Sequence, residues 1–285
     1  MAGRLGWADV EDARRDLIAL MPRDLFLKKL CKGAIKVGGD KTNPIRGNLV
    51  ASVLRELAGY VLHSLAPDDE VKRCVWFEQA KDTTTITRGQ RARYIVQAGL
   101  PDDFVKEKLK VDPAAMAKPL LDAMNKLHKA THVRAETVVR KGSAVRDMLY
   151  EVLSELQALL ENAREARHSI KDAVGAALHN AVFESMILDT IQELDELSTH
   201  TRVNTHWIDV IEVRRLDATE IEYRVTGEVE VELQYGSNSD VANDIGMRSD
   251  DSYPYKAKVV AEARKPLDID AEAIRLTIDT SSFYD

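Results

Sequence analysis

Two histidines four residues apart, His128 and His132, are the residues of this sequence best suited to acid–base chemistry. Imidazole changes its charge near neutral pH, so it can take up and release protons there. On a continuing helix, a spacing of four places both rings on one face. Asn125, Lys126 and Arg134 flank the pair. The cations Lys126 and Arg134 would contact phosphate, and Asn125 would orient the site together with His128. The segment therefore predicts a site for cleavage of an RNA phosphodiester.

The same two histidines have other interpretations. They could be half of a metal site, although a zinc-peptidase helix needs a glutamate beside the first histidine, where this chain has Lys129. They could also cap the end of a helix by binding its last carbonyl groups. The residues alone leave these alternatives open.

A second candidate site lies in the C-terminal region, where Glu228, Glu230 and Glu232 alternate along a strand-like segment. Carboxylates and a lysine on adjacent strands can hold Mg²⁺ and activate water, as in metal-dependent nucleases. Alternating glutamates are also typical of the solvated face of a half-buried sheet. We expect no cofactor, with Mg²⁺ only under this metal-dependent alternative. Its other candidate members are Asp240, Asp244, Lys256, Lys258 and Glu262–Lys265.

Charge is distributed unevenly along the chain. Residues 201–285 carry 10 Lys and Arg against 18 Asp and Glu, a net −8, whereas residues 1–200 carry 30 against 29, a net +1. An acidic domain is poorly suited to a phosphate backbone, so any such contact belongs to the N-terminal region. A solvated helix face is the alternative interpretation of its basic residues. The candidate nucleic-acid contacts are Lys28, Lys29, Lys32, Arg88 and Arg91.

Apolar residues recur at helical spacing through the first 200 residues. Thr87 is suited to cap one helix, and Asp112 followed by Pro113 is suited to begin another. The long amphipathic stretch near its end predicts a bundle or a coiled hairpin. The expected helices cover residues 8–31, 44–65, 68–76, 88–99, 101–109, 113–129, 143–168 and 169–197.

The period changes after His200, and near-strict alternation predicts a strand over 221–235. Further strands are expected near 207–213, 256–263 and 274–278, with a long polar loop over 236–254. The fold class is therefore α+β. A helical domain of residues 1–200 precedes a small antiparallel β-rich domain of residues 201–285.

Several function classes are disfavoured by what the sequence lacks. It has no phosphate-cradling glycine loop, nucleophile elbow or Cys/His zinc pattern, so kinases, P-loop NTPases and zinc fingers are not expected. No apolar stretch approaches the ~20 residues that span a bilayer, and the first residues lack the apolar run of a signal peptide. We expect a cytoplasmic protein without membrane association.

Several short phrases together resemble a known family. They include Thr42-Asn-Pro-Ile-Arg-Gly-Asn48, Leu65-Ala-Pro-Asp-Asp-Glu-Val-Lys72, Thr87-Arg-Gly-Gln-Arg-Ala-Arg-Tyr94, Thr131-His-Val-Arg134 and Val231-Glu-Leu-Gln-Tyr-Gly-Ser-Asn-Ser-Asp240. This combination resembles bacterial proteins described as predicted pPIWI-associating nucleases, which are linked to prokaryotic defence against phage and mobile DNA. The resemblance spans roughly residues 40–265.

A second resemblance concerns the helical region, which looks like the HEPN class of ribonucleases. That class places an arginine a few residues before a histidine, usually across a dimer. Here Leu127 occupies the arginine position before His132, with Lys126 and Arg134 as the nearest cations. The resemblance implies a metal-independent ribonuclease site, and Arg55 and Glu56 would support it from a neighbouring helix.

The leading hypothesis is thus an antiviral-defence nuclease that acts on nucleic acid, preferably RNA, through its helical region. The alternative is a non-catalytic adaptor that dimerises through its long helices and docks a partner defence protein through the β-domain. Both hypotheses favour a homodimer. The sequence leaves open whether the chain is catalytic at all.

Overall fold

The computed structural model describes residues 5–188 and 191–284. The chain forms two compact units. The helical unit runs up to Ala98 and continues from Val105 to Ala166. The sheet unit contains Gly99–Phe104 and the chain from Arg167 onward. The change from helix to strand falls at His200, where the sequence predicted it.

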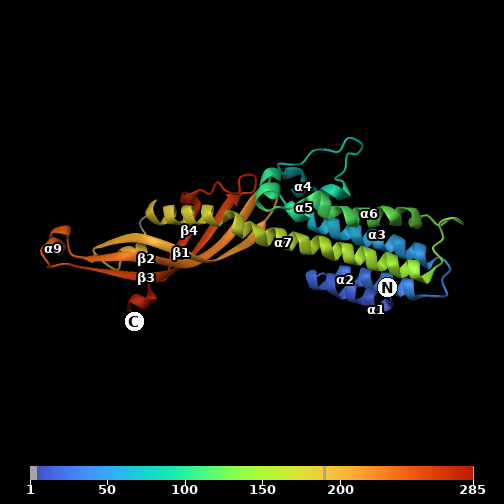
Figure 1. Cartoon of the computed structure of the whole chain (residues 1–285), viewed down its shortest axis with the longest axis horizontal. Coiled ribbons are helices and arrows are strands. Elements are labelled where there is room, and N and C mark those ends of the chain that lie inside the picture. Colours follow the sequence, from blue (N-terminus) through green and yellow to red (C-terminus); the bar gives the residue numbers. More distant parts are fainter. Residues whose placement is uncertain (1–4, 189–190, 285) are drawn as a thin grey trace. The chain divides into compact units, whose positions relative to one another are not determined.

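The helical unit is a bundle around one central helix, α3 (Figure 1). Helix α3 packs against α2, α5 and α6. The apolar side of α3 is fully buried because Val50, Leu54, Leu57 and Val61 recur at helical spacing. The elements of this part of the chain are α1 (Trp7–Leu20), α2 (Leu25–Gly39), α3 (Arg46–Leu65), α4 (Asp68–Arg73), α5 (Arg88–Gln97), the π-helical turn η1 (Phe104–Lys108), α6 (Pro113–Thr131) and α7 (Gly142–Leu188).

Two predicted helix starts are confirmed. The Thr87 hydroxyl accepts from the Gln90 amide at 3.2 Å and begins α5. The Asp112 carboxylate accepts from the amides of Ala114 and Ala115, both at 3.0 Å, and Pro113 opens α6. These side chains bind amide groups that have no partner within the first turn of a helix.

Two predicted helix boundaries are wrong. The single helix expected over 8–31 is divided into α1 and α2, because Pro22 follows α1 and Asp24 caps α2 by accepting from the Leu27 amide at 2.8 Å. The two helices expected over 143–168 and 169–197 are one helix, α7, of 47 residues. Residues 162–173 contain neither Gly nor Pro, so nothing in that stretch breaks the helix.

The sheet unit is built on an antiparallel meander with strand order β1-β2-β3-β4. The short helix α9 lies at the turn between β2 and β3 (Figure 1). Buried side chains alternate with more exposed ones along β2 and, from Tyr253 onward, along β3. Tyr223, Tyr253 and Tyr255 are the largest of the buried ones. The elements after α7 are α8 (Gln192–Asp195), β1 (His200–Leu216), β2 (Glu220–Tyr235), α9 (Asn238–Ala242), β3 (Met247–Glu262), the 3-10 turn η2 (Ala271–Ala273), β4 (Arg275–Ile278) and the 3-10 turn η3 (Ser281–Tyr284).

Strand β1 is longer than the sequence predicted. Its register against β2 shifts three times, between Val203 and Thr205, Ile208 and Val210, and Val213 and Arg215. Each shift interrupts the alternation that identifies a strand in sequence. Gly227 of β2 lies against the β1 backbone, because a Cβ atom there would meet the Trp207 carbonyl oxygen at 1.8 Å.

The prediction of a long polar loop over 236–254 is also wrong. That segment contains α9, and β3 already begins at Met247 rather than near residue 256. The first residues of β3 are exposed on both faces, so they lack the apolar alternation that sequence analysis requires. The α+β fold class is confirmed. No helix within the described residues is long and apolar enough to cross a membrane.

A buried histidine links α7 to the sheet within the sheet unit. The His206 Nε2 donates to the His179 carbonyl oxygen at 3.0 Å, and its Nδ1 accepts from the Tyr255 hydroxyl at 2.9 Å. The Phe183 ring stacks near His206, with centroids 5.8 Å apart. Burial lowers the pKa of His206, and the neighbouring His179 lowers it further, while the carbonyl contact opposes both. The lowered pKa favours the neutral ring.

We expect this histidine to make the sheet unit sensitive to acid. The unfolded chain binds a proton at His206 below a pH of about 6.5, whereas the folded chain binds it only at lower pH. The free energy of unfolding should therefore fall as the pH decreases from 7 to 5. Urea unfolding of wild type and His206→Gln across this range measures the effect.

The exposed His200, at the start of the same strand, offers the matched control. His200→Gln should keep the wild-type pH dependence, and His206→Gln should reduce it. Equal slopes in wild type and His206→Gln would contradict the assignment.

Candidate nucleic-acid site in the helical unit

The last turn of α6 carries the two histidines singled out by the sequence. Helix α6 buries Leu120, Ala123, Met124 and Leu127, so positions 125, 126 and 128 lie outside that buried face. His132 is the residue that ends the helix. The two imidazole rings meet edge to face with their centroids 5.5 Å apart. The expected side-by-side placement of the two rings is thus present, and both residues are exposed.

A buried asparagine of α3 holds this end of α6 and the chain that follows it. The Asn48 side chain donates to the carbonyl oxygens of Ala130 at 2.8 Å and Thr137 at 2.9 Å. Its own oxygen accepts from the Val139 amide at 3.2 Å. Asn48 is only 1% exposed, so its side chain has little access to water and makes its hydrogen bonds to these backbone groups instead.

The residue before it allows this close approach. A Cβ atom on Gly47 would lie 2.6 Å from both the Cβ and the carbonyl oxygen of Val139. Any side chain there would push the 132–139 segment away from α3. Within that segment the Thr137 hydroxyl donates to the His132 carbonyl oxygen and accepts from the Arg134 amide at 2.9 Å. The position of His132 is therefore defined by contacts on both sides.

An arginine from α3 completes the pair of histidines. The Arg55 Nη1 donates to the His128 Nδ1 over 3.0 Å. A guanidinium has no acceptor, so the His128 Nδ1 is unprotonated and its Nε2 carries the proton of the neutral ring. Sequence spacing put Leu127 where an arginine was expected, and Leu127 is buried in the core. The guanidinium beside the histidines instead belongs to Arg55 of α3, which lies 73 positions before His128 in the sequence.

The other predicted catalytic residues have different surroundings. Lys126 pairs with Glu151 of α7, whose hydrogen bond and charge raise the pKa of that lysine. Asn125 and Arg134 are exposed. Among the described residues, no hydrogen bond or ion pair joins either of these two side chains to the histidines. The structure therefore brings together His128, His132 and Arg55, with Lys126 on another side of α6.

The predicted nucleic-acid contacts also separate into groups. Lys29 and Lys32 are exposed on α2, and the Lys28 ammonium donates to the Pro22 carbonyl oxygen at 2.7 Å. Arg91 is 3% exposed and is taken up by the Ala66 carbonyl oxygen and the Asp68 carboxylate, which joins α5 to the end of α3. Arg88 stands at the first position of α5 and lines a pocket.

This pocket lies among α2, α3 and α5 and encloses about 450 Å³. We call it the arginine pocket, because the Arg55 that contacts His128 also lines it together with Arg88. Burial lowers the pKa of Arg88 and the charge of Arg55 lowers it further, while Glu56 raises it. Among the described residues, no carboxylate forms an ion pair with either guanidinium. The other lining residues include Phe26, Gly59, Tyr60 and His63.

The carboxylates of the sheet unit do not gather into one group. Glu232 pairs with Arg248 at 3.6 Å across β2 and β3, and Asp240 accepts from Ser237 at the start of α9. Within the described parts of the chain, no three metal-ligating side chains stand close enough together to share an ion. The alternating glutamates have the placement expected of the solvated face of a sheet.

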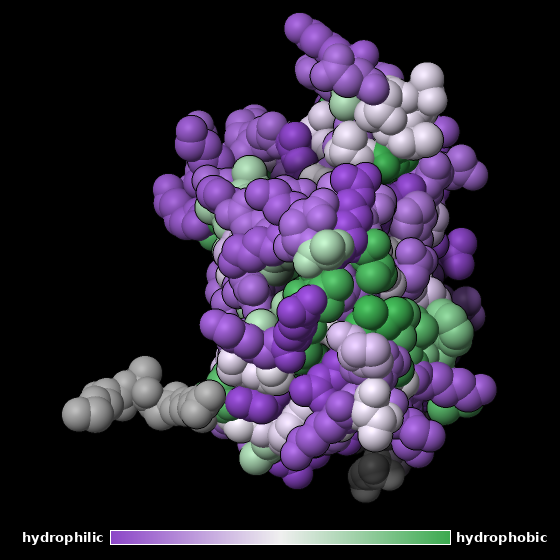
Figure 2. Space-filling model, turned by 90° about the vertical axis from the view of Figure 1, so that its right-hand side faces the viewer, coloured by the Kyte–Doolittle hydropathy of each residue, from purple (hydrophilic) through white to green (hydrophobic). Residues whose placement is uncertain are grey.

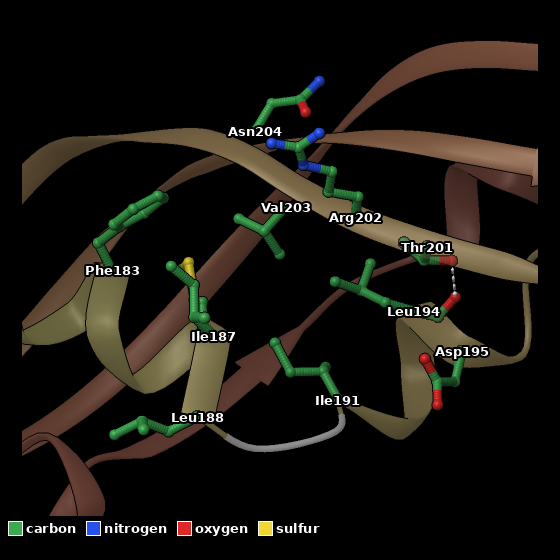
Figure 3. Close-up of a pocket in the computed structure, with 11 residues that line it drawn as sticks. Phe183, Ile187, Leu188, Ile191, Leu194, Asp195, Thr201, Arg202, Val203 and Asn204 are labelled. Atoms are coloured by element: carbon green, nitrogen blue, oxygen red, sulfur yellow. Dashed lines mark hydrogen bonds between the residues drawn. The ribbon is translucent and has the colours of Figure 1, made fainter.

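A second pocket, of about 620 Å³, lies in the sheet unit between the end of α7 and β1. Figure 3 shows Ile187, Ile191, Leu194 and Val203 facing this space, while Arg202 extends from the other side of β1. The Thr201 hydroxyl donates to the Leu194 carbonyl oxygen at 2.9 Å. Aliphatic side chains line part of this pocket, and polar groups of Asp195, Thr201, Arg202 and Asn204 line the rest. None of its described lining residues is a histidine.

The face of the helical unit that carries the α6–α7 connection is largely hydrophilic, with a hydrophobic area near its centre (Figure 2). Three residues of the site lay outside the sequence-based candidates: Asn48, Phe26 and Tyr60. A polar residue beside the apolar face of α3 was a signal for Asn48. No comparable signal pointed to Phe26 or Tyr60, because their proximity depends on how α2 packs on α3.

Comparison with known families assigns the chain to a class. Two family models, both described as predicted pPIWI-associating nuclease, match residues 19–156 and 163–284. The chain therefore belongs to the predicted pPIWI-associating nucleases, a class placed in prokaryotic defence. The first match lies largely in the helical unit and the second largely in the sheet unit. No curated protein and no solved structure matches the chain.

We expect Asn48→Ala to destabilise the helical unit. It removes the partner of partly buried backbone groups of residues 130, 137 and 139, which costs about 1–3 kcal/mol of unfolding free energy. Urea unfolding measures this loss. The exposed Asn125→Ala is the control and should stay within about 0.5 kcal/mol of wild type. Equal stabilities of the two variants would contradict the role given to Asn48.

Proposed function

We propose that this protein is a ribonuclease effector of a pPIWI-associated defence system, which cleaves single-stranded RNA without a metal ion. The observation that carries the proposal is the contact between the Arg55 guanidinium and His128, one helical turn from His132. It supplies a guanidinium beside the histidines, where the local sequence has Leu127 at the position expected for an arginine. Membership in a family described as nucleases supports the reaction class.

The chemistry needs a base, an acid and a positive charge. In the proposed reaction the 2′-hydroxyl oxygen attacks the adjacent phosphorus, and the bond from phosphorus to the 5′-oxygen breaks. Arg55 transfers its hydrogen bond to a phosphate oxygen and neutralises the added charge. The freed His128 Nδ1 takes the proton of the 2′-hydroxyl, and protonated His132 gives a proton to the leaving 5′-oxygen. No further reactant is required.

The biological role and the cellular location follow from the family and the proposed substrate. A family tied to prokaryotic defence suggests an antiviral role, and an RNA substrate suggests the cytoplasm as the place of action. Arg134, Lys29 and Lys32 are exposed cations that would contact the RNA backbone away from the scissile bond. A homodimer and a partner defence protein remain predictions from the sequence. Light scattering of the purified protein measures the first of these.

Substitution of the site tests the activity. His128→Ala or His132→Ala should lower cleavage of labelled single-stranded RNA in EDTA about 10²–10⁴-fold, since each removes a proton-transfer group. Arg55→Gln should cost about 10²–10³-fold, because it removes the charge beside the phosphate. Initial rates from denaturing gels measure these losses.

Two variants serve as controls for the RNA-cleavage assay. Lys126→Ala removes a cation of α6 that is bound to Glu151, and His168→Ala removes an exposed histidine of α7. Both should cleave within about threefold of wild type if the reaction depends on the arginine and its two histidines. Full activity of His128→Ala and His132→Ala, or activity only with Mg²⁺ or Mn²⁺, would overturn the proposal.

The alternative is a non-catalytic interaction subunit, which one observation favours. Ile187 and Leu188 at the end of α7 are 61% and 53% exposed and line the pocket of the sheet unit. Exposed aliphatic side chains around a pocket suit an apolar segment of a partner protein. A folded protein that cleaves neither RNA nor DNA under any condition would favour this function.

A further inference from the structure

We propose that the arginine pocket binds a nucleoside phosphate, with the base against Phe26 and the phosphate at Arg88 and Arg55. This deepens the proposed function, because the same Arg55 joins the pocket to His128. The ligand chemistry could come from one nucleotide of an RNA strand or from a free nucleotide. The experiment below distinguishes the two sources.

The size and lining of the pocket fit such a ligand. Its volume of about 450 Å³ lies within the range of pockets that hold small molecules. Three arginines line the space, and Arg91 is already bound by Asp68. The mutual repulsion of the other two, Arg55 and Arg88, is relieved when an anion binds between them. Glu56 on the same wall can accept hydrogen bonds from ribose hydroxyls or from an amino group of a base. Purely anionic ligands would gain nothing from Glu56.

The aromatic wall is held in a fixed orientation. Phe26 and Tyr60 meet edge to face with ring centroids 4.9 Å apart and an interplanar angle of 74°. The Tyr60 hydroxyl donates to Asp24 at 2.9 Å, and Asp24 also caps α2. Phe26 is nevertheless 51% exposed. A large exposed ring that is already oriented is suited to stacking on a nucleobase.

The floor of the pocket is open because α3 has a glycine there. Gly59 lies inside the helix, where glycine costs about 1 kcal/mol relative to alanine. A Cβ atom at this position would meet no heavy atom within 4 Å. Neither packing nor backbone conformation requires a glycine at this position, and the missing side chain leaves the space beside α3 open.

Filling the pocket tests this inference. Gly59→Leu places a side chain into the space, and Gly33→Leu on α2 is the matched control, since Gly33 also has open space and lies outside the pocket. Thermal unfolding should show that both variants fold. The binding probes are AMP, GMP, CMP and UMP, inorganic phosphate, and a labelled single-stranded RNA decamer. All titrations use the full chain carrying His128→Ala, so that the RNA is not cleaved.

We expect Gly59→Leu to raise the Kd of the nucleotide or RNA at least tenfold, with Gly33→Leu unchanged. Phe26→Ala should raise it about tenfold to a hundredfold and leave phosphate binding unaltered, while Arg88→Gln should weaken both. If free nucleotides bind, the ligand of the pocket is a soluble nucleotide. If only the RNA decamer binds, the ligand is one nucleotide of an RNA strand.

The inference is overturned if Gly59→Leu and Arg88→Gln bind as the parent does, or if none of the probes binds. It is separable from the ribonuclease proposal. If RNA cleavage requires the histidines but is unchanged by Gly59→Leu, the pocket proposal is wrong and the ribonuclease proposal stands. If nucleotide binding requires the pocket but the protein cleaves no substrate, the ribonuclease proposal is wrong and the pocket proposal stands.

Discussion

The candidate site depends on the three hydrogen bonds made by the buried Asn48 side chain. They bind Ala130 at the end of α6 and the backbone of residues 137 and 139 to α3. A helix end and an irregular segment have unsatisfied backbone groups, and burial makes each of them costly. One amide side chain satisfies three such groups. Because His128 and His132 lie on this last turn, their distance from Arg55 on α3 is set by the same contacts.

This arrangement places core packing and the proposed catalytic arginine on the same helix, α3. One side of the helix is the buried core of the helical unit, and its edge carries Asn48, Arg55 and Gly59. A rigid helix holds functional groups more accurately than a loop does. Contacts from α3 hold the exposed histidines at the end of α6 in place, and the arginine pocket is lined by the same helix. Helix α3 thus positions Asn48, the Arg55 guanidinium and the glycine that lines the arginine pocket.

Much of the fold was predictable because its signals are local. The caps at Thr87 and Asp112, the alternation of β2 and the apolar period of α3 each lie within a few neighbouring residues. The errors arose where a local signal was weak or interrupted. Three register shifts obscured β1, an exposed stretch hid the start of β3, and the continuity of α7 could not be read from its apolar period. The site was predicted only in part for a related reason. The two histidines are neighbours in sequence, whereas Arg55, Arg88 and Phe26 come together only through the packing of separate helices.

The central claim is that paired histidines and an arginine, rather than a bound metal, cleave RNA through its own 2′-hydroxyl. The most direct measurement is the chemical identity of the product ends, obtained by mass spectrometry of an RNA oligonucleotide cleaved in EDTA. We predict a 2′,3′-cyclic phosphate on one fragment and a 5′-hydroxyl on the other, and no cleavage where the 2′-hydroxyl is replaced by hydrogen. A 5′-phosphate, or cleavage of the 2′-deoxy position, would contradict it.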